Sequence, residues 1–227
     1  MNLLEKTLNA NRKLLDLDLS ILTWGNVSIR SKEERVVYIK PSGIDLSCAS
    51  PEDMSLVSLE GEHLAGKKPS VDTKTHLKIY NGFEDICAVV HTHSLYATVF
   101  AQAGMDIPCF GTTHADYFYG AIPCVKMPTK KQIDDDYELQ TGINIVNHFL
   151  IHNINPLQVL GAIVHGHGVF CWGTDEVCAL ENALVLEKIA EMSFRTLILD
   201  DNAPSLPDYI LQKHFLRKHG NNKYYGQ

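Results

Sequence analysis

Two His-x-His pairs are the residues of this sequence with the clearest capacity for chemistry. His91 and His93 end one apolar run. His165 and His167 repeat the same spacing after a second apolar run. On a strand, a spacing of two places both imidazoles on one face, so each pair can contact a single ion. One such pair is also typical of hydrogen-bonded interior histidines, but its repetition favours metal binding.

A carboxylate near a predicted helix start completes this candidate metal site. Three imidazoles together with Asp72 suit a borderline divalent ion such as zinc, provided that coordination positions remain for a substrate. His76 follows four residues later and would share a helical face with Asp72, either as an outer partner or as a competing ligand. We predict structural support as its role.

Small residues in three turns offer an anion site. Gly25-Asn26, Ser42-Gly43 and Ser70 can bring backbone amides and hydroxyls close to a phosphate, and Lys40 can add a positive charge. Each of these segments is also an ordinary turn. Only their convergence in space would make them a pocket.

Two further residues are candidates for proton transfer. Asp116 lies in an aromatic stretch and could exchange protons if burial raised its pKa, although a turn or capping carboxylate is the alternative. Tyr225 could be the opposing acid or base. Its position near the end of the chain is equally compatible with docking and with a frayed terminus.

Composition limits the class of protein. At 227 residues, with 45% hydrophobic and 21% charged residues, the chain suits one globular domain spanning 1–227. A net charge of −7 provides no basic surface for nucleic acid, and no apolar run is long enough for a membrane span. Six cysteines without a C-x-x-C pair, and the lack of a signal-peptide pattern, favour a cytoplasmic protein with reduced thiols.

The periodicity of apolar residues predicts the elements that must position these groups. Hairpin patterns at 28–39 and 165–172, with further strands at 54–59 and 88–93, indicate a layered α/β protein with a substantially antiparallel sheet. Ser94 is placed to cap the helix that follows it. The segment 112–117 is predicted to be irregular, and helices are expected near the N-terminus and over 72–83, 137–151, 174–199 and 209–218.

The chain resembles, over nearly its whole length, the L-ribulose-5-phosphate 4-epimerases of the class II aldolase/epimerase superfamily, which fuculose-phosphate aldolase typifies. The resemblance implies a three-layer class II aldolase-like α/β fold, with a largely antiparallel central sheet flanked by helices. It rests on six motifs, which are Thr23-Trp24-Gly25-Asn26-Val27-Ser28, Lys40-Pro41-Ser42-Gly43, Lys68-Pro69-Ser70 with Asp72-Thr73, His91-Thr92-His93-Ser94, Gly111-Thr112-Thr113-His114-Ala115-Asp116-Tyr117, and Lys213-His214 through Arg217-Lys218-His219-Gly220 with Tyr224-Tyr225-Gly226-Gln227.

The resemblance also implies roles for single residues. Three groups follow from it: zinc ligands at Asp72, His91, His93 and His167; phosphate contacts from Asn26, Ser42, Gly43 and Ser70; and proton transfer by Asp116 and Tyr225, assisted by His214. His165 then becomes a neighbour of the site rather than a ligand. Manganese or cobalt are possible substitutes for zinc. The family is a cyclic homotetramer with active sites between subunits, so the C-terminal tail would complete a neighbouring subunit's site.

The implied reaction interconverts L-ribulose 5-phosphate and D-xylulose 5-phosphate by retro-aldol cleavage and re-formation of the C3–C4 bond, a step shared by arabinose and ascorbate breakdown. Asp72 favours an epimerase, because the related aldolases generally have glutamate there. Val71 departs from the family, which commonly has a second serine at that position. The rival hypotheses are an aldolase that releases free aldehyde, and a noncatalytic metal-stabilised binding protein.

Overall fold

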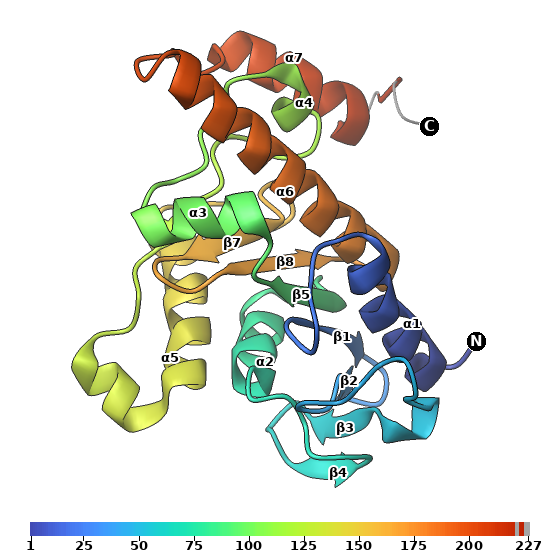
Figure 1. Cartoon of the computed structure of the whole chain (residues 1–227). Helices are drawn as coiled ribbons and strands as arrows, with labels where there is room; N and C mark the ends of the chain where they lie inside the picture. The colour runs from blue at the N-terminus through green and yellow to red at the C-terminus, as the bar shows by residue number, and fades with distance from the viewer. Residues whose placement is uncertain (221–222, 225–227) are drawn as a thin grey trace.

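An eight-stranded mixed sheet lies at the centre of the fold (Figure 1). The computed structural model describes residues 1–220 and 223–224. The strand order is β4-β3-β2-β1-β5-β8-β7-β6, and every neighbouring pair is antiparallel except β6 with β7. The predicted largely antiparallel sheet is therefore confirmed. The strands are β1 Asn26–Ser31, β2 Val36–Ile39, β3 Ser55–Ser58, β4 His63–Ala65, β5 Ala88–Thr92, β6 Cys124–Val125, β7 Gly161–Val164 and β8 Val169–Gly173.

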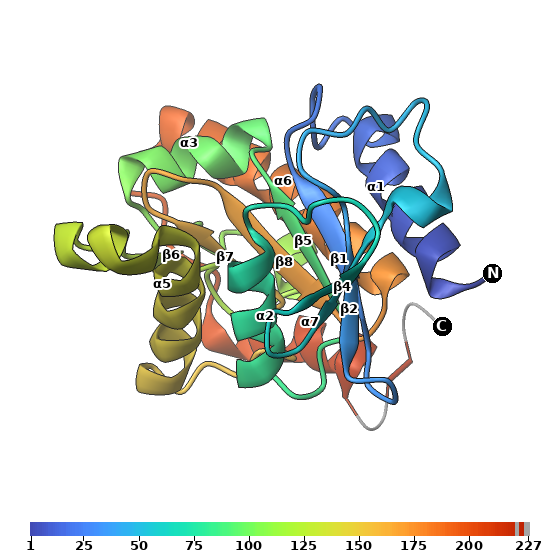
Figure 2. The same ribbon diagram turned by 90° about the horizontal axis from the view of Figure 1, so that it is seen from below.

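Helices cover both faces of the sheet and give the three predicted layers. Helices α2 and α5 lie together on one face, and α1, α3 and α6 cover the other (Figures 1 and 2). Helices α4 and α7 pack on each other beyond α6. Within the described ranges, no helix is long and apolar enough to cross a membrane. The helices are α1 Leu3–Asp16, α2 Thr73–Gly82, α3 Leu95–Ala103, α4 Thr112–Ala115, α5 Lys130–Ile151, α6 Glu176–Leu199 and α7 Asp208–His219, with a 3-10 turn at Pro51–Asp53.

The central strands β5 and β8 are buried along their whole length. Strands covered on both faces read as continuous apolar runs, which explains why the segment before His91 has no polar alternation. Val89 and Trp172 lie opposite each other across the β5–β8 pair, and both are fully buried. The end of β5 is thus anchored in the core.

Two sequence-based boundaries differ from the structure. Helix α5 begins at Lys130, where Thr129 and Gln132 form a capping box, and its backbone breaks at Asp136 (φ −166°, ψ 99°). Because the Asp136 carboxylate accepts from the Leu139 amide at 3.1 Å, the predicted start at Tyr137 corresponds to the second helical segment. The segment predicted as irregular contains α4, a single turn too short to show a helical period.

The capping role predicted for Ser94 is filled by another residue. Ser94 occupies the N-cap position of α3, but its hydroxyl makes no capping hydrogen bond. Instead, the buried Glu187 carboxylate of α6 accepts from the amides of Tyr96 and Ala97 at 2.8 and 3.0 Å. This contact ties the start of α3, directly after His93, to the helix layer.

Replacing Glu187→Gln should therefore destabilise the protein. The side-chain NH2 cannot accept, so one buried amide loses its partner at a cost of about 1–3 kcal/mol. For a chain of this size each kcal/mol corresponds to a fall in Tm of about 2–4 °C, measurable by calorimetry. Glu60→Gln, the same change at an exposed ion pair with Arg35, should alter Tm little. Equal Tm values for the two variants would refute the capping role.

Candidate functional site

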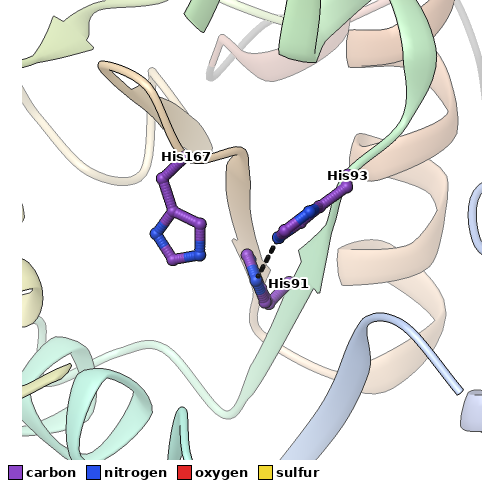
Figure 3. A group of neighbouring side chains, drawn as sticks. All are labelled: His91, His93 and His167. Atoms are coloured by element: carbon purple, nitrogen blue, oxygen red, sulfur yellow. Dashed lines mark hydrogen bonds between the residues drawn. The ribbon is translucent and has the colours of Figure 1, made fainter. Parts of the chain in front are cut away.

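Three histidines, from strand β5, the segment directly after it and the turn between β7 and β8, meet at one end of the sheet (Figure 3). His91 lies near the end of β5 and His93 just beyond it, while His167 lies in the turn between β7 and β8. One nitrogen from each ring falls within 4.8 Å of the other two. The Nε2 atoms of His91 and His93 face each other at 3.2 Å. His91 is oriented by its Nδ1, which contacts the Val169 carbonyl oxygen at 2.8 Å.

The lowered pKa values of two of these histidines favour metal binding at this triad. Burial, followed by the nearby histidines, lowers the pKa of His167 to about 3, although Asp72 opposes the shift. Burial also lowers the pKa of His93. These two rings are therefore neutral at pH 7, with lone pairs available for a cation. The His167 Nδ1 atom is buried without a hydrogen-bond partner in the described structure, which fits a nitrogen meant for a ligand or solvent. Three converging imidazoles fit zinc or a similar divalent ion.

Two glycines allow the backbone of neighbouring turns to approach the triad closely. A Cβ atom at Gly168 would lie 2.7 Å from the Thr92 carbonyl oxygen and 2.9 Å from the His93 ring. Gly25 adopts a φ of +69°, and a Cβ there would lie 2.7 Å from the His91 carbonyl oxygen. Only glycine allows both turns to pack against β5 at these distances.

Asp72, the fourth predicted ligand, lies beside the triad. It precedes the first residue of α2, and its Oδ2 accepts from Asn26 Nδ2 at 2.8 Å and from the Ser70 hydroxyl at 3.3 Å. Burial would raise the pKa of this carboxyl, but His91, His76 and the Asn26 hydrogen bond lower it overall. Asp72 is not within the mutually adjacent set of three donors. It contributes a negative charge next to neutral imidazoles.

The predicted anion-binding segments converge near Asp72. Segments 40–42 and 68–70 are joined by the Ser42 amide to the Lys68 carbonyl and the Ser70 amide to the Lys40 carbonyl. Asn26 Nδ2 also contacts the Ser70 hydroxyl at 3.2 Å. Gly43 follows the exposed Ser42 and has open space at its Cβ position.

Lys40 plays a role that its sequence context did not reveal. Its ammonium donates to the carbonyls of Thr23 and Gly25 at 2.6 and 3.2 Å, and the residue is buried. Burial lowers the pKa of Lys40, with Asp72 opposing the shift. Two of its three N–H groups thus hold the turn that carries Trp24.

The proton-transfer candidates form a second cluster on α4 and α7. Asp116 directly follows α4, and Arg217 contacts both of its oxygens, at 3.0 Å from Nε and 2.7 Å from Nη2. His214 Nδ1 lies 3.1 Å from the same carboxylate, and the His219 ring contacts the Asp116 carbonyl at 2.9 Å. Burial would raise the pKa of Asp116, but Arg217 and His214 lower it overall. Burial therefore does not raise the pKa of Asp116 overall, and the proton-transfer role of Asp116 stays a prediction. Tyr225 lies outside the described residues.

Two aromatic residues beside the triad escaped the analysis of the sequence. The Tyr137 ring lies 5.8 Å from His167, and the Trp24 ring lies 6.2 Å from His93. Trp24 falls within a motif that could have drawn attention to it. Tyr137 carried no such signal, because its place depends on the backbone break at Asp136 and on the packing of α5 against α2.

Comparisons with known proteins identify a matching family, sequence relatives and similar folds. Residues 5–194 match the family described as Class II Aldolase and Adducin N-terminal domain. The chain is 42% identical to proteins named L-ribulose-5-phosphate 4-epimerase UlaF from Salmonella paratyphi A and Salmonella typhi, over 98% of this chain and 97% of each relative. Its fold is similar to an L-fuculose 1-phosphate aldolase (TM-score 0.81, 21% identity, 93% of both chains). YgbL of Klebsiella pneumoniae also shares the fold (TM-score 0.74, 22% identity, 93% of this chain and 96% of that one).

His167→Gln should remove the capacity to retain a divalent metal. Losing one of three converging nitrogens should weaken zinc binding by more than the roughly 10- to 100-fold that loss of an outer partner causes. The measurement is zinc titration of chelator-treated protein against a competing dye. His165→Gln, two residues earlier and outside the triad, is the control and should bind zinc like wild type. Equal losses in both variants would contradict the assignment of the triad.

Proposed function

The chain belongs to the class II aldolase and adducin N-terminal domain family, and from that membership we propose that it is a zinc-dependent L-ribulose-5-phosphate 4-epimerase. It would interconvert L-ribulose 5-phosphate and D-xylulose 5-phosphate by breaking and remaking the C3–C4 bond. The observation that carries the proposal is the three-histidine triad beside Asp72, in a chain whose near full-length relatives bear that name. The aspartate, where related aldolases generally have glutamate, also favours the epimerase.

Substrate binding in this proposal begins at the phosphate. Asn26 and Ser70 supply neutral donors next to the triad, and the Gly43 amide adds a backbone donor, while the Ser42 amide holds its turn to the Lys68 carbonyl. Val71 offers no hydroxyl, so more of the affinity falls on Ser70 and the main chain. The buried ammonium of Lys40 adds positive charge behind these donors.

His91, His93 and His167 would hold zinc, with Asp72 as a further ligand. The same donors accept manganese or cobalt. When bound, the metal supplies a Lewis acid that polarises the substrate carbonyl. The lowered pKa values of His93 and His167 keep their lone pairs available for it at neutral pH.

Proton transfer would fall to Asp116 and Tyr225. Cleavage of C3–C4 requires removal of the C4 hydroxyl proton, and re-formation requires its return. Between the two steps the aldehyde carbonyl would rotate, so that C3 adds to its opposite face and C4 is inverted without a redox cofactor. One proton-transfer group on each side of the reacting carbon would serve the two orientations. Asp116 is ionised at neutral pH, so it is in the form that can accept a proton, but Arg217 and His214 lower its pKa and make it a weaker base. His214 would assist through its contact with that carboxylate.

The two clusters would meet across a subunit interface. Asp116 and α7 pack beyond α6, whereas the triad lies at the end of β5. We therefore propose a cyclic homotetramer, in which the C-terminal tail carrying Tyr225 completes a neighbouring subunit's site. Residues 1–227 would form one domain, and the six free thiols suit the reducing cytoplasm.

A coupled assay of pentulose-phosphate interconversion tests the reaction. Chelation should abolish activity and added zinc should restore it, because the carbonyl would lose its Lewis acid. Steady release of free aldehyde without epimerisation would replace the epimerase with an aldolase. If folded, metal-loaded protein neither epimerises the substrate nor releases aldehyde, the noncatalytic binding hypothesis would remain.

Mixed oligomers test the shared site. His167→Gln and Asp116→Asn should each abolish epimerisation, but co-expressed subunits should recover about one quarter of wild-type activity through sites that combine the two intact halves. The control is the same two variants purified separately and combined without subunit exchange. No recovery in verified mixed tetramers would place both clusters in the same subunit's site.

A further inference from the structure

His76 is a fully buried histidine one helical turn after Asp72. Its Nδ1 lies 2.7 Å from the Ser28 hydroxyl of β1. That hydroxyl in turn lies 2.7 Å from the Tyr80 hydroxyl, which also donates to the Ser28 carbonyl at 3.0 Å. Three polar side chains therefore form a buried row between the sheet and α2.

The other ring nitrogen of His76 is buried beside the site. Nε2 is buried and makes no hydrogen bond within the described part of the chain. Burial lowers the pKa of His76 to about 3 against the opposing charge of Asp72, so the ring is neutral and carries one N–H. A buried N–H or lone pair without a hydrogen bond costs roughly 1–3 kcal/mol, so a hydrogen-bond partner is expected for this nitrogen.

The direction of the hydrogen bonds in this row sets which nitrogen of His76 carries the hydrogen. Burial raises the pKa of Tyr80, so its hydroxyl stays protonated, and its single hydrogen has the Ser28 carbonyl oxygen and the Ser28 hydroxyl oxygen as neighbouring acceptors. With that hydrogen serving both oxygens, the Ser28 hydroxyl donates to His76 Nδ1 and the ring hydrogen is on Nε2. Donation then runs from Tyr80 through Ser28 to His76, and successive bonds of this kind strengthen one another.

Asp72 is the acceptor that fits this N–H. Residues at i and i+4 share a helical face, and Asp72 and His76 are close enough for each group to affect the other's pKa. The hydrogen bonds described for the Asp72 carboxylate end on Oδ2, from Asn26 and Ser70. Behind the site, Phe170 packs edge-on to His76 (6.0 Å) and stacks on His91 (4.2 Å), so the row borders the metal ligands.

We propose that His76 is a positioning residue, whose Nε2–H holds the Asp72 carboxylate through one bridging water in the orientation that metal binding requires. Ser28 and Tyr80 fix the ring that makes this bond. The inference rests on the metal site of the proposed function, and it is independent of which reaction that site performs.

Zinc affinity of chelator-treated full-length protein tests the proposal. His76→Met keeps much of the volume but removes the N–H, and should weaken zinc binding about 10- to 100-fold. His76→Gln can place an N–H where Nε2 stands and should restore affinity to within a few-fold of wild type. Ser28→Ala releases the ring and should give an intermediate loss, which keeps the test valid if His76→Met does not fold.

A matched control separates positioning from stability. Ser193→Ala removes a buried hydroxyl that donates to the Pro108 carbonyl, remote from the triad, and should lower Tm without changing zinc affinity. Unchanged affinity in both Ser28→Ala and a folded His76→Met would overturn the proposal, as would equal losses in His76→Gln and His76→Met. Wild-type protein that binds zinc tightly without epimerising would refute the proposed function and leave this inference standing.

Discussion

The register with which β5 pairs with its two neighbours is the constraint on which the site depends. Asn26 of β1 lies opposite His91, and on the other side His91 lies opposite Phe170 of β8. The start of β1, the end of β5 and the turn before β8 are thereby brought to one end of the sheet. A slip of one residue would send each strand's side chains to the opposite face. The backbone hydrogen bonds of the sheet thus decide where the candidate metal ligands meet, and the glycine turns allow the loops to approach β5.

Burial prepares this end of the sheet for a cation. Histidines that lose solvent lose their protons, as the lowered pKa values of His93 and His167 indicate. The carboxyl of Asp72 instead stays ionised, because the neighbouring His91 and His76 rings and the hydrogen bond from Asn26 lower its pKa and outweigh its own desolvation. The outcome is a set of neutral nitrogens with one negative charge beside them. Such an arrangement suits a divalent ion.

The electrostatics of the Asp116 cluster differ from those of the triad, because its negative charge is paired within the chain. Here a carboxylate is held by Arg217 through two hydrogen bonds and by His214 through a third. Such a bidentate pair fixes orientation as well as charge. Because this cluster belongs to α4 and α7, its geometry does not depend on the strand register that sets the triad. Two independently positioned halves suit the proposed joining across subunits, since neither needs to rearrange.

Local patterns in the sequence determined the class of the fold, most element positions and a short set of metal-ligand candidates, because apolar periodicity and residue spacing act over a few residues. The repeated His-x-His pattern left open whether His165 or His167 joins the other two, and only the family resemblance chose between them. In the structure the turn at Gly166 (φ +71°) lies between these histidines, and it is His167 that meets β5.

Tertiary structure alone also decided the direction of the pKa shift of Asp116, the capping of α3 by Glu187 and the place of Tyr137. Each of these depends on contacts between segments far apart along the chain, and sequence spacing carries no information about such distances.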